Sequence, residues 1–161
     1  MDQTQPVNGS AWLRVSILVG VGLFLLALAV SAAIIPQLRL LHLLQALIYV
    51  AVLILTRRNS PWGFGAGTII AIAWNSLNLF ITHLFQAGAG QLWSLLQTAH
   101  VVDPVPMMVA VGGIGHFILI VACIAGFLEQ RPRGKAWAKF FGGGFLALAY
   151  MALLIATSAP H

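Results

Sequence analysis

Long apolar runs separated by short polar stretches dominate the pattern of the chain. A helix needs about 20 mostly apolar residues to cross a bilayer. Five runs meet that requirement, at about 11–35, 37–56, 61–85, 104–128 and 136–158. Polar residues precede several of them: Ser10 stands before the first, and Ser60-Pro61 and Asp103-Pro104 each offer an N-cap followed by proline. The pattern predicts an all-α fold, a single transmembrane domain built as a bundle of five helices.

The segment between the third and fourth runs has a different pattern. We expect Gly88-Ala89-Gly90 to end the third helix, and apolar residues then recur at helical spacing. The apolar positions are Leu92, Leu95, Leu96 and Ala99, with Gln91, Ser94, Gln97 and His100 on other faces. This arrangement predicts a short amphipathic helix at the membrane interface. It would either cover the mouth of the bundle or serve as a plain connector.

Composition and charge support the membrane assignment and predict an orientation. The chain is 60% apolar and 7% charged, whereas soluble domains carry about 25% charged residues. The basic residues flank the apolar runs instead of forming a face, which argues against a nucleic-acid partner. Arg39 is the one basic residue expected on its side of the bilayer; the other side receives Arg14, Arg57, Arg58, Arg131, Arg133, Lys135 and Lys139. The positive-inside rule therefore predicts a cytoplasmic N-terminus and an external C-terminus, in the inner membrane of a bacterium.

Polar side chains inside the five runs need a partner, because lipid offers none. On the second helix such residues share one face: Arg39, His42, Gln45 and Tyr49. On the third, Asn75, Asn78 and Thr82 share a face that His83 flanks, and on the fourth His116 stands in a stripe of glycines. At about 1.5 Å per residue, His42 matches His83 in depth, Gln45 matches Asn78, and Tyr49 and Asn75 match His116 near the midplane. The match predicts a polar site in the outer half, between the second, third and fourth helices.

Two cofactor-like ligands suit these residues. Haem b needs two imidazoles at similar depth, for which His42, His83 and His116 are the candidates, with Arg39 placed to meet a propionate. A quinone needs hydrogen-bond donors in an apolar slot, and Gln45, Tyr49, Asn75, Asn78 and Thr82 extend the set that could bind it. With either ligand, the protein would be an electron-transfer membrane anchor, a subunit that associates with other membrane subunits.

Two further functions are open from the sequence. An oligomeric channel or transport element for a small solute or ion would use the same Asn, Thr and His side chains as its lining. No run contains a carboxylate, since Asp2, Asp103 and Glu129 are terminal or in loops, and this argues against a carboxylate-coupled proton path. In a plain scaffold or assembly subunit, the polar residues would only form interhelical hydrogen bonds, worth about 0.6 kcal/mol on average. Its partners would be other membrane subunits or a second copy.

Catalysis has little support in the residues. Ser94, His100 and Asp103 share a loop, but no nucleophile elbow surrounds the serine. A zinc site made of His83, His100 and Asp103 would lack outer-shell partners. The single cysteine, Cys123, excludes an intrachain disulfide and a thiolate cage. We therefore expect a non-catalytic subunit or a protein that binds a small molecule.

Overall fold

The five predicted membrane-spanning helices are present in the computed structural model, which describes residues 10–101 and 103–158. They are α1 (Ala11–Ile34), α2 (Arg39–Arg57), α3 (Pro61–Ser76), α5 (Pro104–Glu129) and α6 (Lys135–Ser158). A short 3₁₀ turn, η1 (Pro36–Leu38), leads into α2, and a π-helical turn, η2 (Leu77–Ile81), extends α3. The described residues contain no strand. The predicted all-α bundle of five membrane-spanning helices is confirmed.

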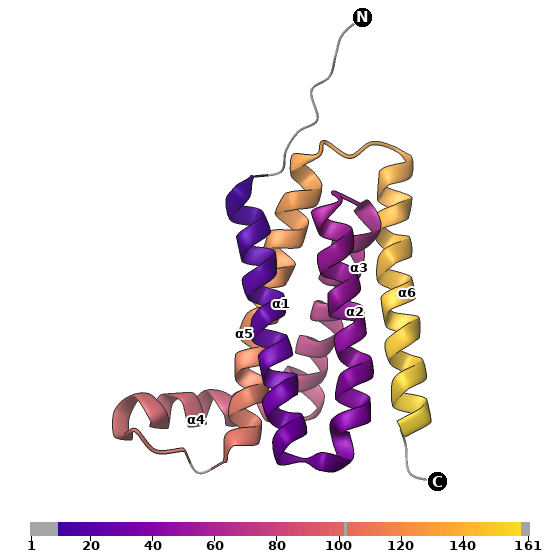
Figure 1. Ribbon diagram of the computed structural model, residues 1–161. Helices are drawn as coiled ribbons and strands as arrows, with labels where there is room; N and C mark the ends of the chain where they lie inside the picture. Colours follow the sequence, from indigo (N-terminus) through magenta and orange to yellow (C-terminus); the bar gives the residue numbers. More distant parts are fainter. Residues whose placement is uncertain (1–9, 102, 159–161) are drawn as a thin grey trace, which may run out of the picture.

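Four of the helices form a closed ring and the fifth packs outside it (Figure 1). α1 lies along α5, α5 along α3, and α2 closes the ring between α3 and α1. α6 packs on the far side of α3 and touches α2. The ring gives the molecule an interior that side chains from four helices share.

Glycines allow the helices to approach closely. At the crossing of α1 and α5, a Cβ added to Gly20 would lie 2.7 Å from the carbonyl oxygen of Gly115. A Cβ on Gly115 would lie 2.6 Å from the carbonyl oxygen of Gly20. Gly65 and Gly143 have the same role between α3 and α6, where added Cβ atoms would collide with backbone. Such contacts matter in lipid, where helices associate through packing instead of a hydrophobic driving force.

The third helix ends earlier than the sequence indicated, at Ile81 instead of residue 85. The break falls at His83, whose backbone is left-handed with φ 56°. Gly88 lies inside the next helix, α4 (Leu84–Thr98), and does not end α3 as expected. Gly88 is needed for packing, because a Cβ at this position would collide with the carbonyl group of Pro106 on α5.

α4 is the predicted helix between the third and fourth spans, and it lies across one end of the bundle and projects beyond it (Figure 1). Its first turns pack on α5, where the ring of Phe85 meets that of Phe117 edge-on at a centroid distance of 6.1 Å. Farther along, Trp93 and Leu96 are 63% and 79% exposed. Exposed apolar side chains on a helix at the end of a bundle suit burial in the interfacial layer of a membrane.

Of the three predicted N-caps, one forms the expected bond. The carboxylate of Asp103 accepts a hydrogen bond from the backbone N–H of Val105 at 3.0 Å. Ser60 precedes α3 without a capping bond from its side chain. Ser10 instead links the start of α1 to the end of α5, because its hydroxyl and its backbone N–H both donate to the carboxylate of Glu129.

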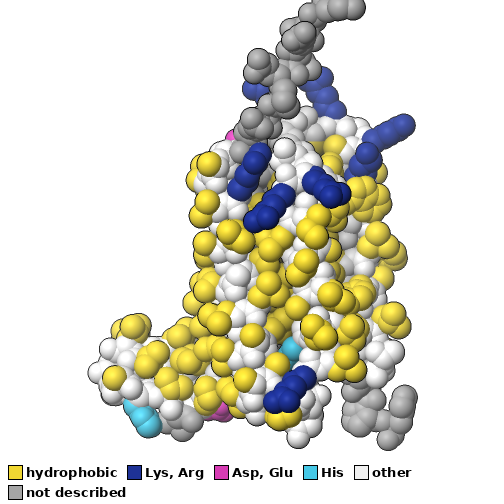
Figure 2. All heavy atoms as spheres, viewed as in Figure 1, with side chains coloured by type: hydrophobic (Ala, Val, Ile, Leu, Met, Phe, Trp, Pro, Cys, Tyr) yellow, Lys and Arg dark blue, Asp and Glu magenta, His cyan; other side chains and the backbone are white. Residues whose placement is uncertain are grey.

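The basic residues gather at the end of the bundle opposite α4 (Figure 2). We call it the basic end; it carries Arg14, Arg57, Arg58, Arg131, Arg133, Lys135 and Lys139. The opposite end, which we call the α4 end, carries Arg39. The positive-inside rule assigns the end that is richer in Lys and Arg to the cytoplasm. The cytoplasmic position of the basic end stays a prediction.

Candidate ligand-binding cavity

Three polar side chains from three helices meet in the middle of the bundle. The Tyr49 hydroxyl of α2 lies 2.8 Å from Nε2 of His116 on α5. Nδ1 of His116 lies 3.2 Å from Oδ1 of Asn75 on α3. The Asn75 amide nitrogen in turn donates to the carbonyl oxygen of Gly113 at 3.3 Å.

One placement of the protons satisfies this whole network. Because the amide nitrogen of Asn75 donates to Gly113, its oxygen faces His116 and accepts from Nδ1–H. Nε2 of His116 then accepts from the hydroxyl of Tyr49. Both ring nitrogens of a neutral His116 are therefore engaged, and the side chains of all three residues are at most 5% exposed.

Phe24 of α1 completes the network as its apolar cover. Its ring centroid lies 4.3 Å from that of Tyr49 and 4.2 Å from that of His116. Each helix of the four-helix ring therefore contributes one side chain at this level. The common depth predicted for Tyr49, Asn75 and His116 is confirmed by their hydrogen bonds, and a role in ligand binding stays a prediction.

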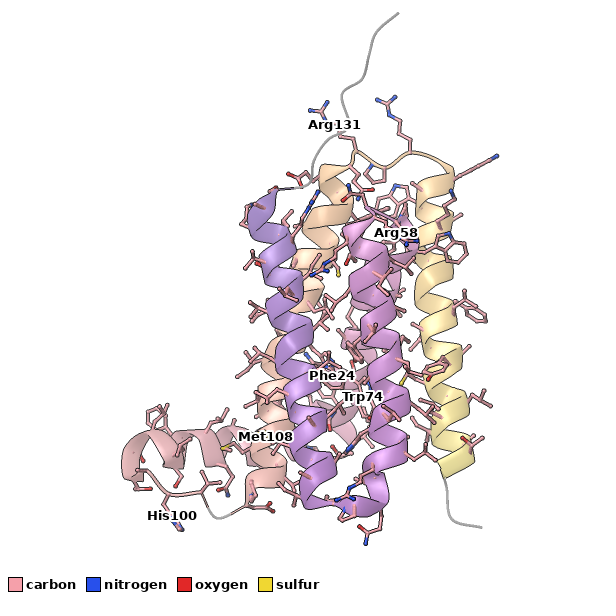
Figure 3. The ribbon with its side chains drawn as sticks, viewed as in Figure 1. Phe24, Arg58, Trp74, His100, Met108 and Arg131 are labelled. Carbon is pink, nitrogen blue, oxygen red and sulfur yellow. The ribbon has the colours of Figure 1, made fainter. Side chains whose placement is uncertain are left out.

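Between this network and the α4 end, the bundle encloses a cavity of about 270 Å³. Figure 3 shows Phe24 and Trp74 near the middle of the bundle and Met108 closer to α4, and all three line the cavity. The walls come from α1, α2, α3 and α5, with Leu84 added by α4. Most of the lining is apolar; the hydrogen-bonding side chains are Ser31, His42, Gln45, Trp74, Asn75, Asn78 and His116.

Three of these polar side chains lack a partner. Nδ1 of His42 and Nε1 of Trp74 are buried without a hydrogen bond. Gln45 is 3% exposed, and the described residues give its carboxamide no hydrogen bond. An unsatisfied buried polar group costs about 1–3 kcal/mol, so native structures supply such groups with water or a ligand. Water or a ligand in the cavity would supply the partners that these side chains lack.

The remaining predicted residues lie at the margin of the cavity or outside it. Asn78 lines the cavity but is occupied, because it donates to the carbonyl oxygen of Trp74 at 2.9 Å and accepts from Thr82 at 3.2 Å. Thr82 is exposed, and exposed Arg39 donates through Nε to the carbonyl oxygen of Ala32 at 3.1 Å. His83 is also exposed and does not line the cavity. His42 lines the cavity, whereas His83 lies at the left-handed turn that follows the helix and is not part of the lining.

Sequence reasoning missed Trp74 and Phe24. Trp74 precedes Asn78 by one helical turn and so shares its face, which was the signal that could have included it. Phe24 follows Gly20 by one turn, on the side of α1 that faces α5. The sequence did not place either residue in the predicted site, because an aromatic residue in an apolar run cannot be told from a lipid-facing one by its pattern.

The residues present do not fit haem b. Axial ligation by two histidines needs two imidazoles, each with a free nitrogen directed at one iron. His116 uses both nitrogens within the network, and exposed His83 lies outside the cavity. His42 is the cavity histidine that keeps an unpaired nitrogen. Among the described residues, no group of three His, Cys, Asp or Glu side chains could hold a metal ion.

Comparison of the chain with models of protein families, with curated proteins and with solved structures finds no match. The cavity and its unpaired polar groups are therefore the features from which a function can be inferred.

Proposed function

We propose that this polytopic membrane protein binds a lipophilic small molecule with a hydrogen-bonding head, of the quinone class, in the cavity beside Trp74. The observation that carries the proposal is the set of unpaired polar groups on a mostly apolar wall: His42, Gln45 and Trp74. Ligand pockets typically combine apolar lining with a few convergent polar groups that fix orientation.

The three groups have the chemistry that quinone carbonyls require. The indole N–H of Trp74 can only donate, and the carboxamide of Gln45 can donate or accept. Nδ1 of His42 donates in one neutral tautomer and accepts in the other, so it can bind either a quinone oxygen or a quinol hydroxyl. The apolar walls, including Leu41 and Met108, would contact the ring.

The size of the cavity suits the head of such a molecule. A volume of about 270 Å³ equals that of about nine liquid waters at roughly 30 Å³ each. It lies just below the roughly 300–1,000 Å³ of pockets that enclose drug-sized ligands. The cavity would therefore hold a ring with its substituents, and an isoprenoid-like tail would extend into the lipid.

The packing of the other half of the bundle supports a pocket more than a pore. On the side of the network towards the basic end, side chains fill the interior: Val21, Val52 and Leu119 have 0% exposure. Cys123 and Phe127 continue this core towards the end of α5. A cavity that is closed at one end by packed side chains and lined with unpaired polar groups is expected of a binding site, whereas a pore would continue through the bundle.

In this proposal the protein is a non-catalytic subunit of the bacterial inner membrane. Its cavity would lie in the outer half of the bilayer, because the basic end would face the cytoplasm. Other membrane subunits would supply the electrons that reduce or oxidise the bound quinone, so this chain would act as an anchor and binding site.

A titration with decyl-benzoquinone tests the proposal. Quinones quench tryptophan fluorescence on contact, and Trp74 lies in the cavity wall. We expect saturable quenching of the protein in mild detergent, and Trp74→Phe should remove its saturable part. Organic extraction of the freshly purified protein, followed by mass spectrometry, should recover a native quinone.

Two substitutions and a matched control locate the binding site. Gln45→Leu and His42→Leu should each weaken binding about fivefold, the equivalent of one hydrogen bond of about 1 kcal/mol. His83→Leu removes the same ring from an exposed position outside the cavity and should leave the dissociation constant unchanged. Linear, unsaturable quenching, or equal effects of His42→Leu and His83→Leu, would refute the proposal.

A further inference from the structure

A second cavity lies on the lipid-facing side of the molecule, between α2, α3 and α6. It is a groove of about 330 Å³ with apolar walls, and it is distinct from the cavity beside Trp74. Residues from all three helices line it, among them Leu47, Ala51 and Leu55 of α2, Trp62 of α3, and Gly143 and Tyr150 of α6. The Tyr150 hydroxyl is already used, since it donates to the carbonyl oxygen of Leu44 at 2.7 Å and ties α6 to α2. The groove therefore offers apolar contact along its length.

Glycines shape the groove at the basic end. A Cβ on Gly143 would collide with the carbonyl group of Trp62, so α3 and α6 touch there through backbone. A Cβ on Gly142 would lie 2.8 Å from the indole ring of Trp62. The indole is thereby held against α6, 38% exposed, where it forms a wall of the groove.

Two cations lie just beyond the basic end of this groove, outside its apolar lining. Arg58 is the residue directly after α2, three positions beyond the groove-lining Leu55, and it lies just past the lining of the groove. Lys139 precedes Gly143 by four residues and lies on the groove-lining face of α6. Figure 3 shows Arg58 at the basic end, on the side of the bundle that α6 occupies. Neither side chain has a hydrogen bond or ion pair with the described residues.

The distance from Lys139 to the far end of the groove matches one leaflet. Lys139 and Tyr150 are eleven residues apart on α6, which is about 16 Å at 1.5 Å per residue. Half of a hydrocarbon core about 30 Å thick is about 15 Å. A lipid whose headgroup lies beside Lys139 would therefore extend an acyl chain as far as Tyr150.

We propose that this groove is a specific site for an anionic phospholipid of the leaflet at the basic end. One acyl chain occupies the groove between α2 and α6, and the phosphate lies between Arg58 and Lys139. The apolar lining selects a chain, and the pair of unpartnered cations selects the negative headgroup. The site is independent of the ligand proposed for the other cavity.

Native mass spectrometry of the full chain in detergent tests the site. The probes are phosphatidylglycerol and phosphatidylcholine with identical acyl chains. We expect one retained phosphatidylglycerol, bound at least tenfold more tightly than phosphatidylcholine. The double variant Arg58→Gln with Lys139→Gln should weaken phosphatidylglycerol binding about 25-fold, about fivefold for each charge. Phosphatidylcholine binding should stay the same.

A control variant that also loses two positive charges distinguishes binding in the groove from general attraction to the basic surface. Arg131→Gln with Arg133→Gln removes two cations from the loop at the same end and should leave phosphatidylglycerol binding unchanged. A loss equal to that of the groove variant would overturn the proposal, as would full retention of the lipid by the groove variant.

A variant that keeps every charge tests the acyl-chain half of the site. Ala51→Phe fills the groove and should weaken both lipids, whereas Ala29→Phe places the same ring on an exposed position of α1 and should weaken neither. If the double glutamine variant fails to fold, these two alanine variants still test whether the lipid binds in the groove. Lipid retention unaffected by Ala51→Phe would contradict the proposed place of the chain.

Discussion

The crossing of α1 and α5 allows a matched pair of substitutions on one helix. Gly20→Ala would place a methyl group 2.7 Å from the carbonyl oxygen of Gly115 and 3.0 Å from the backbone nitrogen of Leu119. Gly22→Ala, half a turn away, would place the same group where nothing lies within 4 Å. The two variants have the same composition and the same gain in helix propensity, so their difference in stability isolates the close approach of the helices.

The expected difference follows from three magnitudes. Alanine in place of glycine gains about 0.8–1.0 kcal/mol of helix propensity at an interior position. Overpacking a tight contact costs about 1–3 kcal/mol, and Gly20→Ala must move backbone atoms instead of a flexible side chain. If the helices separate by about 0.5–1 Å to relieve the clash, atoms along the crossing lose roughly a quarter to a half of their dispersion energy. We expect Gly22→Ala to raise the free energy of unfolding by up to about 1 kcal/mol, and Gly20→Ala to fall about 1–3 kcal/mol below it.

Denaturation in mixed detergent micelles measures this difference. Increasing mole fractions of dodecyl sulfate would unfold each variant, and circular dichroism with tryptophan fluorescence would follow the transition. Gly20→Ala should have the lower midpoint and Gly22→Ala a midpoint at or above that of the unsubstituted chain. A Gly20→Ala protein as stable as Gly22→Ala would refute the close helix approach.

Two further predictions concern the buried network and the orientation. Tyr49→Phe leaves Nε2 of His116 without its donor, so the same assay should show a loss of about 1 kcal/mol, within the roughly 0.6–1.7 kcal/mol measured for such bonds in membranes; unchanged stability would contradict the proton placement. In a Cys123→Ala background, an impermeant maleimide should label His100→Cys in intact cells and Arg133→Cys after lysis alone; the reverse pattern would invert the proposed orientation.

The spans were predictable because the bilayer sets one length that every spanning helix must reach. The end of α3 was not predictable, because glycine can either end a helix or let two helices pack closely. Gly88 resembled a helix breaker in the sequence, yet it lies inside α4 and lets that helix pack on Pro106. The helix actually breaks at His83, whose backbone is left-handed. No local residue pattern predicts that conformation at this position.

The site was predictable as far as depth and face were concerned. Counting 1.5 Å per residue placed Tyr49, Asn75 and His116 at one level, and the structure joins them by hydrogen bonds. The same counting could not foresee the turn that removes His83 from the helix. It also left out Trp74, because a hydropathy pattern counts tryptophan with its apolar neighbours although the indole carries one polar nitrogen.

The contrast between the network and the cavity wall is the strongest argument against a plain scaffold. Both sets of polar residues are buried in the same bundle, and they are of similar chemical types. In the network, each partner of His116 is matched, so its polarity is fully accounted for by interhelical bonding. On the cavity wall, His42 and Trp74 keep buried polar atoms unpaired, at a cost of about 1–3 kcal/mol each. Thr68 and Gln130 also keep a buried side-chain atom without a partner, but neither lines this cavity. The unpaired atoms of His42 and Trp74 lie on the cavity wall, and this placement supports the proposed ligand site over a plain scaffold.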